Sequence, residues 1–167
     1  MAEKAQRQGV NFSFVTDDRI KEVLEDYWDQ AHAANRAGVY AAVVVLCGGV
    51  LEGLLAWAIS TKEQEARKRF SDCFTYRDGG EKPISSWDLT PLIRVAKGLD
   101  LIGITSERLL RAVQDFRNFI HPCNVIKHSA RPNERLANIS LETVGEVVRS
   151  LKGRMIKTKN AEPESDA

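Results

Sequence analysis

The chain has 167 residues, of which 43% are hydrophobic and 28% charged, and its formal net charge at pH 7 is +1. This length supports one domain with a substantial core and is short for two. The nearly neutral charge argues against a protein that coats nucleic acid without specificity, although it permits a local basic patch. Three cysteines, Cys47, Cys73 and Cys123, are widely spaced. Because residues 1–10 are polar and charged and do not resemble a secretory signal, we expect reduced thiols and a cytoplasmic location.

The first predicted helix begins near residue 17 and has one apolar side. Thr16 can cap its start, and Asp17 and Asp18 then lie at the positive end of the helix dipole. Gly38 marks its end. Apolar residues recur between these points at the three- and four-residue spacing of a helix, namely Ile20, Val23, Leu24, Tyr27, Trp28, Ala31 and Ala34.

The second predicted helix is the most apolar segment of the chain. Residues 39–59 read VYAAVVVLCGGVLEGLLAWAI, a run about long enough to cross a bilayer. Glu52 interrupts this run and would cost about 2.5–3.5 kcal/mol at the centre of a membrane. The amphipathic segments elsewhere also need an apolar partner. We therefore expect no membrane span, but a helix from about residue 40 that is buried by the bundle or by a second subunit.

The middle of the chain predicts a loop and a short third helix. The charged run at residues 62–69 is interpreted as a solvated extension of the second helix. Residues 71–86 are rich in turn-forming residues and predict a loop. Thr90 before Pro91 is a good pair for the start of a helix, and Gly98 marks its end.

Two further helices complete the prediction. Thr105 or Ser106 opens the fourth helix, and Ser140 caps the last one. No alternating strand pattern or repeat is present, so the expected fold is an all-α bundle of four or five helices. The chain then divides into three parts: a flexible N-terminal arm (1–15), a helical domain (16–156) and a disordered acidic tail (157–167).

The most informative motif lies at the end of the fourth helix and reads Arg117-Asn118-Phe119-Ile120-His121-Pro122. If the helix continues this far, Arg117 and His121 share one face, because they are four residues apart. Arginine can hold a phosphate in a fork of donors, and histidine can transfer a proton near neutral pH. The pairing suits phosphodiester cleavage without a metal.

Plainer roles for these residues stay open. Arg117 can form an ion pair with Asp115 or Glu52, and His121 can interact with the negative end of the helix dipole. Asn118 can simply cap or bend the helix end. Positive residues around the motif form a candidate RNA-binding set or, alternatively, an ordinary solvated face: Arg108, Arg111, Lys127, Arg131 and Arg135.

The sequence contains no motif for metal binding or for a phosphate-binding glycine loop. Cys73, His121, Cys123 and His128 lack zinc-finger spacing, so we expect no metal site. Gly48-Gly49 lies inside the apolar helix and is better explained by close helix packing than by phosphate binding. No cofactor is expected.

The motif and its lead-in, LLRAVQDFRNFIHP, resemble the HEPN-domain family, as does the apolar helix with its embedded glutamate. This resemblance covers roughly residues 40–151 as a pattern of helices, and it is specific only in the motif. It implies an all-helical bundle of the kind found in prokaryotic toxins, antiviral effectors and RNA-processing enzymes. Arg117, Asn118 and His121 occupy the family's motif positions, with at least one residue fewer between arginine and histidine than usual.

The resemblance also implies a mechanism and partners. The RNA 2′-hydroxyl attacks the adjacent phosphate, His121 transfers a proton, Arg117 neutralises phosphoryl charge and Asn118 orients the phosphate or the histidine. A symmetric homodimer brings two motifs together. The chain is thus expected to be a metal-independent endoribonuclease of a toxin–antitoxin or phage-defence type, with an antitoxin or defence protein as a possible partner. The alternative is a non-catalytic helical dimer that binds a partner protein or nucleic acid.

Overall fold

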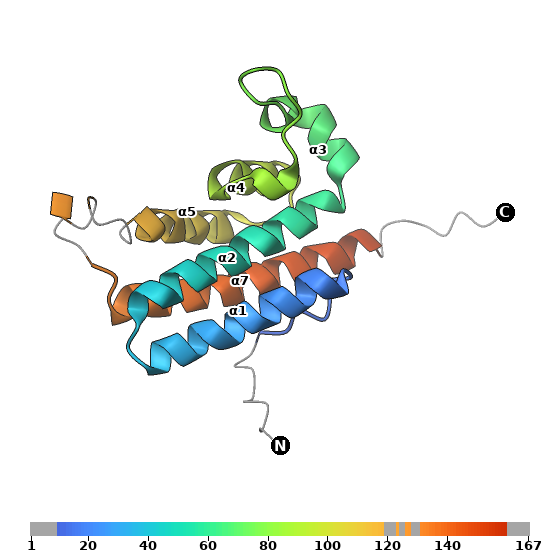
Figure 1. Ribbon diagram of the computed structural model, residues 1–167. Helices are drawn as coiled ribbons and strands as arrows, with labels where there is room; N and C mark the ends of the chain where they lie inside the picture. The colour runs from blue at the N-terminus through green and yellow to red at the C-terminus, as the bar shows by residue number, and fades with distance from the viewer. Residues whose placement is uncertain (1–9, 119–122, 124–125, 128–130, 160–167) are drawn as a thin grey trace.

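The fold is all-α (Figure 1). The computed structural model describes residues 10–118, 123, 126–127 and 131–159, with residues 117–118 and 156–159 described by their backbone only. Within these residues the β-structure is limited to one isolated bridge between Thr75 and Glu81. The elements in chain order are α1 (Asp18–Arg36), α2 (Tyr40–Ser60), α3 (Glu63–Arg69), the 3₁₀ helices η1 (Ser71–Phe74) and η2 (Ile84–Ser86), α4 (Leu89–Gly98), α5 (Ile104–Asn118) and α7 (Glu134–Lys159).

Helix α2 forms the centre of the molecule. It contacts α1 and α7, which run alongside it in Figure 1, and it also contacts α4 and α5. Its length and apolar composition would allow it to cross a membrane, but the core helix of a globular bundle can have the same length and composition. Most residues of α2 are buried inside the bundle. Valine and leucine side chains at its centre, such as Val50, Leu51 and Leu54, are fully buried. The predicted buried helix from about residue 40 is therefore confirmed.

Two glycines let α1 approach α2 closely. A Cβ atom at Gly49 would lie 3.1 Å from the Tyr27 ring, and one at Gly53 would lie 3.2 Å from Leu24. Both distances are tighter than ordinary van der Waals contact, so a larger residue would push the two helices apart. The predicted role in close helix packing is thus confirmed for Gly49, and Gly53, which the prediction did not include, has the same role.

Two helix starts differ by one or two residues from the prediction. Asp17, and not Thr16, caps α1, because its Oδ1 accepts hydrogen bonds from the backbone N–H groups of Arg19 and Ile20 at 3.0 and 3.2 Å. In the same way Asp88, and not Thr90, caps α4, with a 2.9 Å bond from the Thr90 N–H. Aspartate and threonine are both good caps, and the path of the preceding chain decides between them.

The last helix begins earlier than predicted. Asn133 accepts a hydrogen bond from the Leu136 N–H at 3.1 Å, and α7 starts at Glu134. Ser140, predicted as the cap, is instead buried inside the helix, where its hydroxyl donates to the Leu136 carbonyl at 2.8 Å. A serine that bonds back one turn is compatible with a helix interior, which the sequence pattern did not distinguish from a cap.

The segment before α1 is part of the core. Val10, Phe12 and Val15 are 6%, 1% and 1% exposed, and they belong to the same hydrophobic cluster as α2. The boundary predicted after residue 15 is therefore too late, because residues 10–15 belong to the packed domain. The remainder of the predicted arm and residues 160–167 of the predicted tail lie outside the described residues.

Residues 61–86 carry more structure than the sequence indicates. The charged run forms a separate helix, α3, instead of extending α2. Arg67 forms ion pairs with Glu63 in the same helix and with Glu81 in the following segment, both at 2.7 Å. The predicted loop contains η1 and η2. Phe74 and Trp87 pack edge to face there, with ring centroids 4.8 Å apart. Buried aromatic side chains therefore anchor this connection to the bundle.

A pair of glycine substitutions tests the packing of α4. A Cβ atom at Gly98 would overlap the Phe70 ring, whereas one at Gly153 in α7 would meet open space. We expect Gly98→Ala to destabilise the fold by about 1–3 kcal/mol through overpacking. Gly153→Ala should stabilise it by about 0.5–1 kcal/mol, because alanine is the better helix former. Urea unfolding of both variants measures the difference, and equal effects would contradict the packing at Gly98.

The cysteines are expected to differ sharply in reactivity. Cys47 and Cys73 are buried and Cys123 is exposed, and all three are free thiols. Burial raises the pKa of Cys47 from 9.0 to about 12, so its thiol should stay protonated in the folded protein. A thiol reagent at mild alkaline pH should modify Cys123 quickly and Cys47 only after unfolding. Because the unfolded thiol ionises first, this group should also lower stability as pH rises from 9 towards 12.

Candidate functional site

Helix α5 positions the sequence motif, and its two sides differ. Leu110 and Val113 are fully buried and Ser106 is nearly so, and together they mark the side that faces the bundle. Arg108 and Arg111 are exposed on the opposite side. The helix packs against α2, α4 and α7, and Gln114 ties it to α4 by donating a 2.5 Å hydrogen bond to the Thr90 hydroxyl. The amphipathic spacing of the sequence is thus realised in the structure.

Arg117 and Asn118 occupy the last turn of α5, as predicted. Position 117 follows Val113 by four residues and Leu110 by seven, so by register it falls on the side that faces the bundle. Position 118 is about 100° further around the axis, on the side of Arg111. His121 lies outside the described residues, so the predicted sharing of one face by Arg117 and His121 remains a prediction.

The structure separates the motif arginine from the other α5 arginines. By register, Arg108 lies about 180° from Arg117 around the helix axis and Arg111 about 120° from it. Arg111 also forms an ion pair with Glu107 at 2.9 Å. Lys127 and Arg131, which follow the motif in the sequence, are exposed. Arg108 and Arg111 therefore do not share a side of α5 with position 117.

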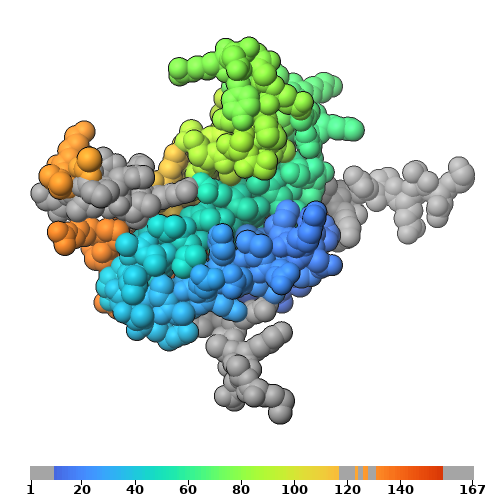
Figure 2. Space-filling model, viewed as in Figure 1, coloured from blue at the N-terminus to red at the C-terminus, as the bar shows by residue number. Residues whose placement is uncertain are grey.

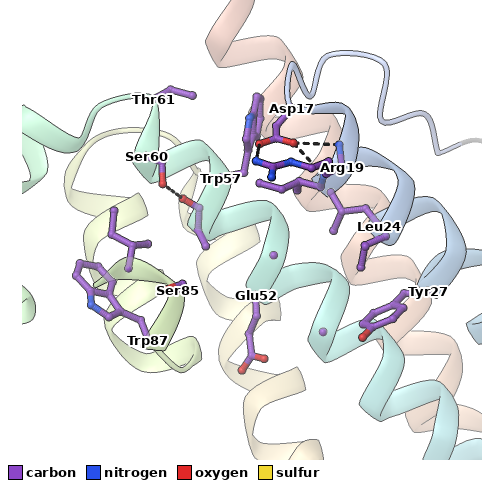
Figure 3. A pocket seen from close by; sticks show the side chains of 16 residues that line it. Asp17, Arg19, Leu24, Tyr27, Glu52, Trp57, Ser60, Thr61, Ser85 and Trp87 are labelled. Carbon is purple, nitrogen blue, oxygen red and sulfur yellow. Dashed lines mark hydrogen bonds and ion pairs between the residues drawn. The ribbon is translucent and has the colours of Figure 1, made fainter. Parts of the chain in front are cut away.

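A groove between α1, α2 and η2 was not anticipated from the sequence. It encloses about 860 Å³, and in Figure 2 the surface of α2 is visible between α1 and the segment around η2. Its lining is mostly apolar and includes Trp57 and Trp87. Figure 3 shows Glu52 projecting from α2 between the Trp87 and Tyr27 rings. The groove is therefore a mainly apolar surface with a few polar groups, Glu52 among them, which is the usual character of a ligand or partner site.

The exposed side of α1 borders this groove. Val23 and Tyr27 remain 50% and 38% exposed, although the helical pattern assigned both to the core-facing side. The apolar stripe of α1 is wider than one neighbouring helix can cover, and this width is the signal in the sequence that could have indicated an open apolar surface. Asp17 and Arg19 form an ion pair at 3.7 Å at one end of the groove.

A carboxylate inside an apolar run is costly to bury alone, so the sequence predicts that Glu52 is buried or half-buried and paired with an arginine such as Arg117 or Arg111. The residue is half-buried, in agreement with the prediction. Arg111 pairs with Glu107 instead, because the two are four residues apart on one helix. The Arg117 side chain lies outside the described part, so this pairing remains a prediction.

Among the described residues, no three His, Cys, Asp or Glu side chains lie close enough together to hold a metal ion. His121 and His128 of the zinc set considered above lie outside these residues. The chain matches no family model, and no curated protein or solved structure shows significant similarity to it.

Proposed function

We propose that the protein is a cytoplasmic, metal-independent endoribonuclease with a HEPN-like bundle, and that its active site lies at the C-terminal end of α5. The observation that supports this proposal is the register of Arg117. It falls on the side of α5 that faces the bundle, whereas Arg108 and Arg111 point to solvent. A charge near the packed side of a helix is costly unless it is paired or used, so such an arginine favours a function over an ordinary solvated face.

The proposed reaction needs a charge and a proton carrier. The RNA 2′-hydroxyl attacks the adjacent phosphorus and displaces the 5′-oxygen of the next nucleotide, which leaves a 2′,3′-cyclic phosphate. Arg117 would donate hydrogen bonds to the phosphoryl oxygens as negative charge builds on them. His121 would accept the 2′-hydroxyl proton or donate one to the leaving oxygen. Asn118 would orient the phosphate or the imidazole from the outer side of the last turn.

One histidine cannot easily make both proton transfers in a single step. We therefore propose a homodimer with the two motifs close to the two-fold axis, since such an interface brings the same patch of both subunits together. Light scattering at micromolar concentration should give twice the chain mass of 18.7 kDa. A stable monomer under these conditions would count against the shared site.

The first test compares RNA and DNA of the same sequence, incubated with the purified protein in EDTA. We expect cleavage of the RNA alone, because the DNA lacks the attacking 2′-hydroxyl. Cleavage that stops in EDTA would show metal-dependent chemistry and contradict the proposal.

The exposed arginines of α5 should affect binding more than catalysis. Arg108→Ala and Arg111→Ala each remove a positive charge from the side of α5 away from Arg117. We expect a raised KM with little change in kcat, and a shallower dependence of affinity on salt, because these residues would contact only the RNA backbone. Steady-state kinetics at two salt concentrations would measure both, and a loss confined to kcat would contradict this division of roles.

The groove on α2 favours a second candidate function, a non-catalytic helical protein that binds a partner such as an antitoxin or defence protein. Its exposed residues Val23 and Tyr27 continue the apolar lining, and apolar surfaces of this kind mark interaction sites. Partner or RNA binding without cleavage would select this function. Val23→Asp should then abolish partner binding, whereas it should leave an endoribonuclease at the end of α5 active.

A further inference from the structure

A small cavity lies between α1 and α7, separate from the groove on α2 and from the end of α5. It encloses about 250 Å³. Its lining brings Trp28 and His32 from α1 together with Leu141, Glu142, Gly145 and Arg149 from α7. Trp28 and His32 are one helical turn apart, and their rings meet edge to face with centroids 4.4 Å apart. The cavity therefore places two polar rings on one wall and charged groups on the other.

Two buried nitrogen atoms on this wall make no hydrogen bond within the described part of the chain. They are Trp28 Nε1 and His32 Nε2. Trp28 is only 2% exposed, and its indole nitrogen can act only as a donor. A buried polar atom of this kind costs about 1–3 kcal/mol unless a partner satisfies it. Both atoms belong to residues that line this cavity, so a ligand with oxygen acceptors could satisfy them after a small shift of the two rings.

The opposite wall supplies one guanidinium group, that of Arg149. A Cβ atom at Gly145 would lie 3.4 Å from Arg149 Nη1, so the guanidinium lies over the glycine at the cavity. Arg149 uses its Nη2 for a 3.2 Å ion pair with Glu146 and retains other N–H donors. Burial lowers the pKa of His32, and the nearby positive charge of Arg36 lowers this pKa further, whereas the negative charge of Asp29 partly raises it. The neutral imidazole can still present an N–H at Nε2 to an oxygen.

We propose that this cavity binds a small oxyanion, a carboxylate or a phosphate, whose oxygens accept hydrogen bonds from Trp28 Nε1, His32 Nε2 and Arg149. Among the described residues of the lining, Glu142 is the one that is acidic, and it opposes the anion. A bound ligand would join α1 to α7, two helices that otherwise touch at few positions. The site is independent of the proposed endoribonuclease activity, and it can be tested without it.

The indole N–H signals of the protein give a direct test by NMR. The chain has three tryptophans, and Trp28→Phe assigns the Trp28 signal while keeping most of its packing. Inorganic phosphate and acetate are added in separate titrations, and sodium chloride at the same ionic strength serves as the reference. We expect the Trp28 signal to move and saturate with at least one of them, and the responding anion identifies the class. Trp87 is the internal control, because its Nε1 is also buried and has no hydrogen-bond partner among the described residues, but Trp87 lines the groove on α2.

Substitutions of opposite sign sharpen the test. Arg149→Gln should weaken binding of the responding anion about tenfold or more, because it removes a charge-assisted hydrogen bond. Glu142→Gln should tighten it severalfold, because it removes a like charge. Lys152→Gln, three residues further along α7 and outside the cavity lining, should change it less than about twofold. A Trp28 signal that does not respond to either anion, moves equally with the other two indoles, or responds unchanged in Arg149→Gln would overturn the proposal.

Discussion

His121→Ala and Arg117→Ala should each reduce RNA cleavage in EDTA by at least about 100-fold while the protein remains folded. His121→Ala removes the proton carrier, which typically contributes a factor of about 10²–10⁴. Arg117→Ala removes the charge that stabilises the phosphoryl oxygens in the transition state, and this electrostatic effect is usually of similar or larger size. Single-turnover cleavage with excess protein measures the loss without interference from product release.

The matched control for these variants is Lys68→Ala. Lys68 is exposed on α3, so its replacement removes one positive charge away from the helix that carries the motif. We expect its cleavage rate to stay within about twofold of the wild type. Circular dichroism and light scattering of all three variants verify the fold and the assembly. Full activity in both motif variants would show that Arg117 and His121 have only structural roles.

Phe12→Ala should cost about 3–5 kcal/mol of folding free energy, although Phe12 precedes the first helix. The side chain is 1% exposed and belongs to the main hydrophobic cluster. Since domains of this size are stable by only about 5–15 kcal/mol, the loss should be a large fraction of the total. Urea unfolding measures it, and the neighbouring exposed residue provides the control, with Ser13→Ala expected to change stability by less than about 0.5 kcal/mol. A small effect of Phe12→Ala would show that residues 10–15 do not contribute to the core.

The all-α class and the central helix were predictable because they depend on periodicity and on a long apolar run. The start of α7 was not predictable, since Asn133 and Ser140 are both acceptable caps and the sequence pattern does not distinguish between them. The N-terminal segment was missed for a related reason. Phe12 and Val15 lie in a stretch too short for a periodic signal, so their burial depends on contacts with distant parts of the chain.

The candidate site was predictable only in part. The sequence placed Arg117 and Asn118 at the end of a helix, and the structure agrees. It also grouped Arg108 with them, although the register of α5 puts Arg108 on the opposite side. Charge counted along a sequence ignores the direction of each residue around the helix axis. The groove on α2 was missed because an apolar stripe shows which side of α1 is apolar, and only the unusual width of this stripe indicates that neighbouring helices leave part of it uncovered.

The chemical ends of the RNA fragments test the central claim most directly. After incubation with the wild-type protein in EDTA, we predict a 2′,3′-cyclic phosphate on the upstream fragment and a 5′-hydroxyl on the downstream one. These ends arise only when the 2′-hydroxyl is the attacking group. Fragments with 3′-hydroxyl and 5′-phosphate ends, or RNA that remains intact while a dimer is present, would contradict metal-independent cleavage by Arg117 and His121.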